Sequence, residues 1–311
     1  MEKYDDILLL VNQAIDEYFE EKDRFVFRNT GESKGFQYRT IASAKSIEKE
    51  IKKCIYPGCK NLSIRRSHTV QRASLEIISD NQHLLCPAVK EGNLIMKSIG
   101  INEASTFPGF CQSHENVFKE FEQYKEFTTF KDFQLQLFRT ICREIVFMQS
   151  KITGYEMIKD EYISFRNTQL SKRIEELIGS REAISIKNLN IKCDDWGIRK
   201  VNSELKRLSV LLNFLKRQYR RIFSDIKQNT EKKFSIYTVE LDWIIPLVLA
   251  GIVNFNVGFK NTSHNIYMFV NVIPLENKTL VLIGGDKRED EYISAYVDML
   301  HNPLQVLNRV Y

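Results

Sequence analysis

The pattern of hydrophobic and polar residues changes along the chain, and each change predicts a different kind of structure. Residues 1–30 have the spacing of an amphipathic helix followed by a short strand, and residues 31–53 join a glycine-containing turn to a Lys-rich helical segment. Short alternating runs then predict strands at residues 62–68 and 83–89, with a polar helix between them at residues 70–78. This part of the chain is therefore expected to consist of short elements.

From Cys111 onward the apolar residues recur every three or four positions, which predicts helices. A first helix follows Cys111, a second runs from about residue 131 to 165, and a third runs from about residue 197 to 230. Residues 180–195, between the two long helices, are expected to be irregular. The two long helices predict an antiparallel hairpin.

The C-terminal part of the chain returns to strand patterns and ends with a helix. The strands are expected at residues 234–243, 266–275 and 278–285, a hairpin turn at Asn277–Lys278, and the helix from Asp290 to about His301. Gly284 and Gly285 follow a strand but lack the rest of a dinucleotide or P-loop fingerprint.

The longest apolar run, Leu241–Val253, is about thirteen residues long and contains Asp242 and Pro246. A membrane-spanning helix needs about 20 residues, so the run is expected to be a buried core element. The N-terminus is acidic and lacks the basic start and apolar centre of a signal peptide. Together these features predict a cytoplasmic protein that makes no membrane contact.

Composition places the chain among globular proteins. Of its 311 residues, 43% are apolar and 27% are charged. The formal charge of +5 is too small by itself to indicate a nucleic-acid partner. In a cytoplasmic protein, clustered cysteines indicate a metal site rather than disulfides.

Four residues in two pairs have the side chains of a zinc site. Cys54 and Cys59 flank a Pro-Gly turn, while Cys111 and His114 lie three residues apart at the start of a predicted helix, where such positions face the same side. Three thiolates and one imidazole are the ligands of a structural zinc site, which the sequence therefore predicts. The alternative is that these are unrelated buried cysteines. The three other cysteines are expected to be packing residues: Cys86, Cys142 and Cys193.

The Cys54–Cys59 turn, called the knuckle below, is followed by two predicted strands and by the helix with the second ligand pair. This is the order of elements in a treble-clef zinc domain. The predicted fold class is thus α+β, with a small treble-clef domain, a long-helix middle and a β-rich C-terminal module. The expected parts are residues 1–50 (N-terminal helix and strand), 51–128 (zinc domain), 129–233 (long-helix hairpin) and 234–311 (β-rich domain).

Two stretches carry a family resemblance. CIYPGCKNLSIRRSH (residues 54–68) and ASTFPGFCQSH (residues 104–114) resemble bacterial HNH-like treble-clef proteins, some of which belong to antiviral defence systems. The resemblance covers about residues 50–125. In HNH endonucleases a histidine at the end of the first strand activates water against a phosphodiester, and a bound divalent metal stabilises the developing charge.

The resemblance implies a role for particular residues. His68 falls at the position of the general base, and Glu115 or Asn116 would help to hold a catalytic Mg²⁺ or Mn²⁺ ion. The chain departs from the family at Ser67, where a metal-binding Asp or His is usual. His68 could instead be a zinc ligand or a hydrogen-bonded structural residue. His83 is expected to be a core or edge histidine.

Two groups of basic residues could contact the phosphates of DNA or RNA. Residues 199–233 contain eleven Lys or Arg and three Asp or Glu. The candidates are Lys216, Arg217, Arg220 and Arg221 in one stripe at helical spacing, and Arg65, Arg66 and Arg72 around His68. The stripe could equally be a solvated helix face, or it could face the acidic N-terminal helix.

Two functions follow from these observations. The first is a zinc-stabilised, HNH-like protein that acts on nucleic acid, a candidate metal-dependent endonuclease of bacterial defence. The second is a non-catalytic protein whose zinc domain is structural or binds nucleic acid, while its helices or C-terminal module bind a partner protein or a second copy of the chain.

Overall fold

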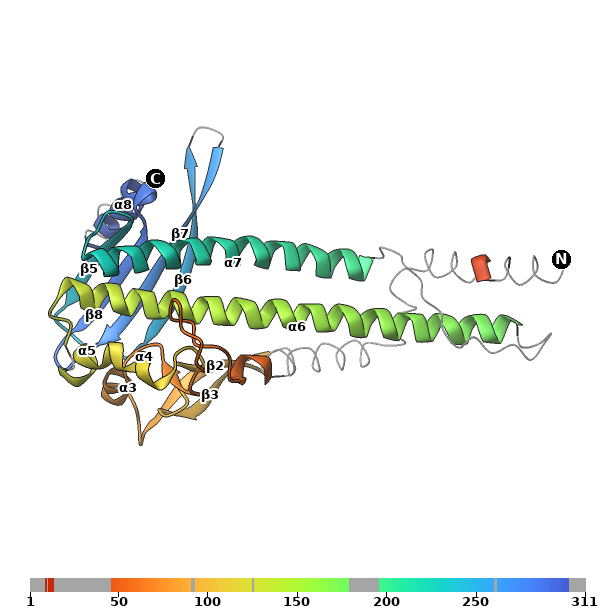
Figure 1. Ribbon diagram of the computed structural model, residues 1–311, viewed down its shortest axis with the longest axis horizontal. Coiled ribbons are helices and arrows are strands. Elements are labelled where there is room, and N and C mark those ends of the chain that lie inside the picture. Colours follow the sequence, from red (N-terminus) through yellow and green to blue (C-terminus); the bar gives the residue numbers. More distant parts are fainter. Residues whose placement is uncertain are drawn as a thin grey trace. The chain divides into compact units, whose positions relative to one another are not determined.

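The structure is a computed structural model, and it describes residues 9, 11–13, 46–90, 93–124, 126–178, 196–259 and 262–301 (Figure 1). Most of the predicted N-terminal helix and strand, the segment at residues 180–195 and Cys193 lie outside these residues. The chain divides into two compact units. One comprises residues 1–47 and 150–210, and the other comprises residues 48–149 and 211–311.

Two long helices contribute to both units: α6 (Phe130–Ile178) and α7 (Trp196–Gln228). In the first unit their apolar residues are buried at intervals of about four, as at Ile158, Tyr162 and Leu170 of α6. The Lys159 ammonium donates a hydrogen bond to the Asn202 side chain across the pair, at 2.9 Å. The predicted long helices are therefore present, and α6 extends beyond its expected end.

The second unit contains a four-stranded antiparallel sheet in the order β5-β8-β7-β6. Its strands are β5 (Phe234–Leu241), β6 (Leu249–Phe259), β7 (Thr262–Pro274) and β8 (Thr279–Asp286). The short 3-10 helix η3 (Lys287–Glu289) leads into α8 (Asp290–His301). The predicted mixture of helices and strands, with a sheet near the C-terminus, is confirmed.

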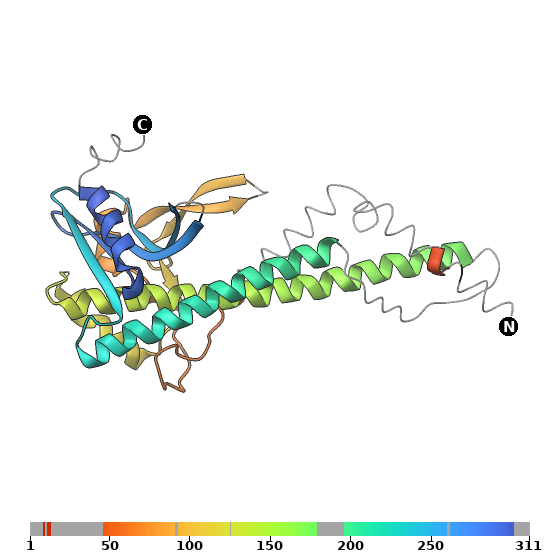
Figure 2. The same cartoon turned by 90° about the horizontal axis from the view of Figure 1, so that it is seen from above.

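Helices cover both faces of this sheet (Figure 2). Ile293 and Val297 of α8 join the buried apolar cluster on one face, together with Met268 of β7. On the other face α6 packs so closely against β8 that a methyl group on Gly284 would lie 2.7 Å from Leu137. Small residues at the helix–sheet contact therefore set how closely these layers approach.

The expectation that Leu241–Val253 is a buried core element is wrong. The run comprises the end of β5, a loop and the start of the edge strand β6. Trp243, Ile244 and Leu247 in the loop are 61%, 41% and 49% exposed. The loop is held by buried Thr279, whose hydroxyl donates to the Trp243 carbonyl and accepts from the Ile245 N–H, each at 2.8 Å.

The remaining elements of the second unit are short. They are β1 (Ser67–His68), α3 (Arg72–Ile77), β2 (His83–Lys90), β3 (Asn93–Gly100), β4 (Thr106–Phe107), α4 (Gln112–Glu115), the 3-10 helix η2 (Asn116–Phe118) and α5 (Lys119–Tyr124). Strands β1 and β4 pair antiparallel, with His68 opposite Thr106, and β2 and β3 form a separate hairpin. The predicted strand at residues 62–68 is thus much shorter than expected.

Candidate metal centre and the neighbouring charge cluster

The two predicted ligand pairs meet in space. One ligand atom from each of Cys54, Cys59, Cys111 and His114 lies within 4.8 Å of the other three. Cys54 and Cys111 are buried, while Cys59 and His114 are partly exposed. These four residues lie close enough to hold a metal ion, and the ligand set is consistent with zinc.

Three of the six distances between ligand atoms match those around a tetrahedral ion. With zinc bonds of about 2.3 Å to sulfur and 2.0–2.1 Å to nitrogen, tetrahedral ligands lie about 3.8 Å apart for two sulfurs and about 3.5 Å apart for sulfur and nitrogen. The Cys59 and Cys111 sulfurs are 3.9 Å apart. His114 Nδ1 lies 3.5 Å from the Cys54 sulfur and 3.3 Å from the Cys111 sulfur. His114 therefore presents Nδ1, not Nε2, to the centre.

A tight turn positions the first ligand pair. Gly58 has a φ of +77°, a left-handed conformation that glycine adopts without the penalty of a Cβ atom. The Cys59 N–H donates to the Tyr56 carbonyl at 3.1 Å, which closes the turn, and the Ile55 N–H donates to the Gly109 carbonyl at 2.8 Å. The second bond joins this knuckle to the segment just before Cys111.

The second pair is fixed where α4 begins. Cys111 is the residue before the first helical turn, and its backbone N–H donates to the Cys54 sulfur at 3.2 Å. Burial by itself would raise the pKa of the Cys111 thiol, but hydrogen bonds from His114 and the two other thiols outweigh it and lower the pKa to about 6. Burial raises the pKa of Cys54 to about 11. Of these two thiols, Cys111 is thus the more ready to bind as thiolate.

Aromatic side chains enclose the centre. The Tyr56 ring stacks on the His114 imidazole with centroids 4.0 Å apart and 10° between planes. The edge of Tyr56 also meets Phe223 of α7, at 5.4 Å. Tyr219, one turn earlier on α7, donates its hydroxyl proton to the Ile55 carbonyl at 2.5 Å. The knuckle is therefore clamped between α4 and α7.

His68 is not part of the metal centre. It lies in β1, and its Nε2 atom is buried without a hydrogen-bond partner among the described residues. Burial lowers the pKa of the imidazole, and the positive charge of Arg139 lowers it further. A hydrogen bond with the backbone of Ile101 raises the pKa but does not offset these two effects. The lowered pKa therefore favours the neutral form of the ring, and its Nε2 atom is left unpaired among the described residues.

A buried arginine lies beside His68. The Arg139 side chain of α6 is fully buried and forms ion pairs with Glu115 and Glu122, from opposite ends of its guanidinium group. The same group lies 4.5 Å from the centre of the Phe118 ring. Glu115, the predicted ligand of a catalytic metal, is thus bound to a protein cation.

The other predicted catalytic position gives no second metal site. Asn116 is exposed at the start of η2. Within the described ranges, Cys54, Cys59, Cys111 and His114 form a cluster of His, Cys, Asp or Glu side chains that could hold a metal, and no such cluster includes His68. Ser67 is buried, and its hydroxyl accepts a hydrogen bond from the Phe110 N–H at 3.2 Å. This contact gives Ser67 a structural part in joining β1 to the segment before α4.

The predicted nucleic-acid-binding residues divide into two groups. Arg66 and Arg72 pair with Glu103 and Glu76, at 3.5 and 3.0 Å, and Arg221 pairs with buried Asp286. The other four are exposed and form no ion pair with a described residue: Arg65, Lys216, Arg217 and Arg220. The proposed stripe on α7 is therefore split, because Arg221 turns toward β8.

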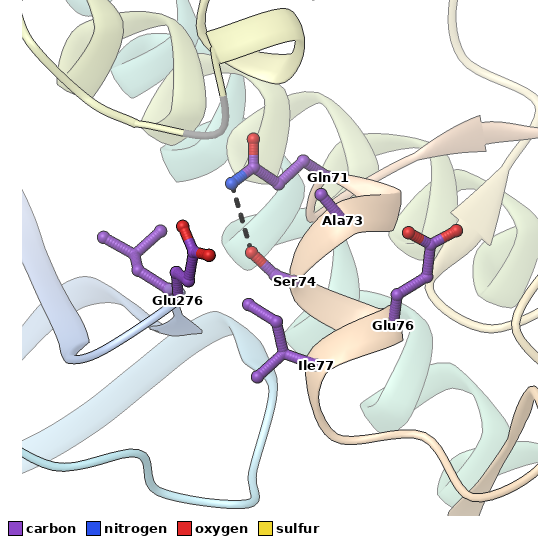
Figure 3. A pocket seen from close by; sticks show the side chains of 7 residues that line it. Gln71, Ala73, Ser74, Glu76, Ile77 and Glu276 are labelled. Atoms are coloured by element: carbon purple, nitrogen blue, oxygen red, sulfur yellow. Dashed lines mark hydrogen bonds between the residues drawn. The ribbon is translucent and has the colours of Figure 1, made fainter.

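A pocket of about 270 Å³ lies elsewhere in the second unit (Figure 3). It is lined by α3 residues such as Ser74 and Ile77, and by Leu275 and Glu276 after β7. The amide of buried Gln71 donates to the Ser74 hydroxyl at 3.1 Å at its edge. None of the predicted catalytic or metal-binding residues lines this pocket.

Sequence reasoning missed three residues that shape the site. They are Arg139, Tyr56 and Tyr219. Arg139 is 17 positions from its partner Glu122, and Tyr219 is 164 positions from Ile55. Tyr56 lies between two ligands and stacks on His114, so the spacing of residues in the sequence did not indicate any of the three. The single available signal was an arginine within the apolar face of a predicted helix. Such a residue needs a buried acidic partner.

No family model, no curated protein and no solved structure matches the chain. Among the helices in the described part of the chain, none has the length and apolarity required to cross a bilayer.

Proposed function

We propose that the chain is a zinc-stabilised treble-clef protein that binds nucleic acid without cleaving it. Zinc is favoured because three thiolates and one imidazole, at tetrahedral spacing and largely buried, make up a closed structural site. The treble clef is supported by the order of its parts: the Cys54–Cys59 knuckle, the β1/β4 pair, and α4 with the last two ligands. The β2–β3 hairpin and α3 are insertions between its two strands.

Arg139 is the observation that carries the non-catalytic assignment. HNH chemistry requires a divalent ion next to the general base. In this chain a guanidinium group, 0% exposed, pairs with the carboxylates of Glu115 and Glu122 near His68. A divalent ion would have to displace a buried arginine and leave its charge without a partner, which is strongly unfavourable.

One observation favours the second candidate function, a metal-dependent endonuclease. The His68 imidazole is neutral and its Nε2 has no hydrogen-bond partner among the described residues, as a general base requires. This candidate needs α6 to withdraw Arg139 when substrate binds. The two functions differ in whether added Mg²⁺ or Mn²⁺ has an effect.

The test combines metal analysis with binding and cleavage assays on the same preparations. We expect the purified protein to contain zinc, Cys111→Ala to lose it, and both His68→Ala and the exposed control His83→Ala to retain it. Wild type should bind DNA or RNA in a salt-dependent way, and it should give no cleavage in EDTA, Mg²⁺ or Mn²⁺.

Two results would contradict this proposal. Cleavage that requires Mg²⁺ or Mn²⁺ and is lost in His68→Ala, but not in His83→Ala, would establish the endonuclease instead. A wild-type protein without zinc would remove the treble clef from both candidates.

A further inference from the structure

One face of α7 contacts the knuckle and has a lysine at each end of the contact. Lys216, Tyr219, Phe223 and Lys227 follow one another at intervals of three, four and four, so their side chains lie on the same face of the helix. Tyr219 and Phe223 contact Ile55 and Tyr56 of the knuckle. Lys216 and Lys227 are both exposed, one at each end of this contact.

Three further cations belong to the same region. Lys53 and Lys60, on either side of the Cys54–Cys59 knuckle, are exposed. Arg220 is exposed too, and its Nε donates to the Lys216 carbonyl at 3.2 Å, so its side chain lies back along the helix toward Lys216. We call Lys53, Lys60, Lys216, Arg220 and Lys227 the knuckle–α7 surface.

The acidic side chains in the described part of the chain leave the charges of this surface unpaired. No Asp or Glu of the described residues lies within ion-pair distance of any of its five members. Lys52, the residue before Lys53, is half-buried and interacts electrostatically with Glu50 and Glu48, and it is not a member of this surface. By contrast, exposed Arg66, Arg72 and Lys278 in the same unit each have an acidic partner.

We propose that the knuckle–α7 surface binds the phosphate backbone of nucleic acid and does not read the bases. This inference rests on the proposed function and names the face that performs it. From Lys216 to Lys227 the helix rises about 17 Å, at 1.5 Å per residue. Phosphates of one strand recur about every 3.4 Å along a duplex, so the row spans about five of them.

The composition of the surface explains why base readout is not expected. Lysine acts on phosphate as a point charge without directional preference. The aromatic rings of the row, Tyr219 and Phe223, are engaged with the knuckle and cannot stack on bases. The surface therefore provides electrostatic attraction, which depends on salt and not on sequence.

The same chemistry argues against an anionic membrane as the partner. A helix that lies on a bilayer exposes large apolar side chains next to its basic ones. On this face of α7 the apolar side chains pack against the knuckle instead. Nucleic acid needs the cations alone, so it is the partner that the surface fits.

The test measures salt-dependent binding of fluorescent oligonucleotides by anisotropy, with single-stranded DNA, single-stranded RNA and duplex DNA as probes. The surface variant combines Lys216→Gln, Arg220→Gln and Lys227→Gln. The control variant combines Arg66→Gln, Arg72→Gln and Lys278→Gln, and so removes the same charge from paired positions. Zinc content and thermal unfolding check that both variants are folded.

We expect the surface variant to lose at least about tenfold in affinity near 100 mM salt, and its slope of log affinity against log salt to fall by about 2–3, close to one per lost contact. The control variant should change by less than about threefold, because its cations already have acidic partners.

Three outcomes would overturn the inference. Equal losses in both variants would mean that net charge alone matters, and unchanged binding by the surface variant would place the contact elsewhere. In both cases nucleic-acid binding itself stands. Binding of vesicles rich in phosphatidylserine through the same three residues, without binding of any oligonucleotide, would assign the surface to lipid and contradict the proposed function as well.

Discussion

At the scale of single residues, Arg139 occupies the carboxylates next to His68 and so determines which chemistry is possible there. A buried guanidinium needs partners for its charge, and Glu115 and Glu122 supply them from α4 and α5. The three side chains join α6 to the ligand-bearing α4, close to His68. Glu115, which the sequence predicted to hold a catalytic metal, is therefore part of the packing of this unit.

Removal of the Arg139 charge should be costly. Arg139→Met leaves two buried or half-buried carboxylates without a counter-charge, and it should lower the free energy of unfolding by about 3–5 kcal/mol. Urea denaturation at pH 7 measures the loss. In Arg72→Met the lost pair with Glu76 is exposed, and the cost should be below about 1 kcal/mol. Similar small costs in both variants would show that the Arg139 pairs contribute little.

His68 predicts how stability depends on pH. Its native pKa is lowered below the ordinary value of 6.5, so near and below pH 6.5 the unfolded chain binds more protons than the folded one. The free energy of unfolding should therefore fall as the pH falls through this window. The contribution is about 1.4 kcal/mol for each unit by which the pKa is lowered.

The measurement compares His68→Gln with the exposed control His83→Gln between pH 7 and pH 5. Loss of metal at low pH affects both variants alike, so the difference between them isolates His68. His68→Gln should lose less stability on acidification than His83→Gln. An NMR titration of the His68 ring with a midpoint at or above 6.5 would refute the argument.

At the scale of elements, short connections determine where the ligands meet. The segment from β4 to α4 turns so tightly that a Cβ atom on Gly109 would lie 2.1 Å from the Phe107 ring. The Gly109 carbonyl in turn accepts the Ile55 N–H of the knuckle. The Pro-Gly step before Cys111 therefore does more than end a strand, because it brings the two ligand pairs together.

Gly109→Ala should destabilise the protein by about 1–3 kcal/mol, the cost of forcing extra volume into a packed site. It should also weaken zinc retention against a chelator. Gly100→Ala is the matched control, since a Cβ atom there would meet nothing within 4 Å. Thermal unfolding and metal release rates compare the two. Equal behaviour of the two variants would mean that the Phe107 ring moves aside at little cost.

At the scale of the whole molecule, each of the two units is stabilised by its own kind of internal contact. In the first unit, the described residues show two helices packed along apolar stripes. In the second, the metal centre joins the knuckle, α4 and α7, while the sheet and α8 have an apolar cluster of their own. Loss of metal should therefore affect these two parts of the second unit differently.

Chelation should loosen the knuckle, α4 and the Tyr219 turn of α7, and leave β5–β8 protected. Ligand thiolates that are brought together without an ion repel one another. The free energy of zinc binding is coupled to folding, so loss of the ion removes that contribution to stability. Hydrogen exchange with and without EDTA measures this, with the amides of β7 and β8 as the internal reference. Uniform loss of protection across the sheet would show that the metal supports the whole unit.

Several features could be predicted from the sequence alone because they depend on local periodicity and side-chain chemistry. The long helices, three of the four C-terminal strands and the closing helix follow from the spacing of apolar residues. The four residues that lie close enough to hold a metal follow from the spacing of Cys and His. Residues 253–259 of β6 do alternate between apolar residues and Asn or Gly. The strand was missed because its first residues belong to the apolar run Leu241–Val253, which was interpreted as a single buried core element although its loop lies exposed.

Only the tertiary structure decided which of the predicted residues are available for chemistry. Periodicity places Arg139 on a helix face but cannot show that Glu115 and Glu122 meet it there. Likewise, the α7 stripe predicted from spacing proves to be divided, since Arg221 pairs with Asp286 while Lys216 and Arg220 face solvent near the knuckle. The physical reason is that charge pairing and burial depend on neighbours distant in sequence, whereas periodicity and ligand type are local properties of the chain.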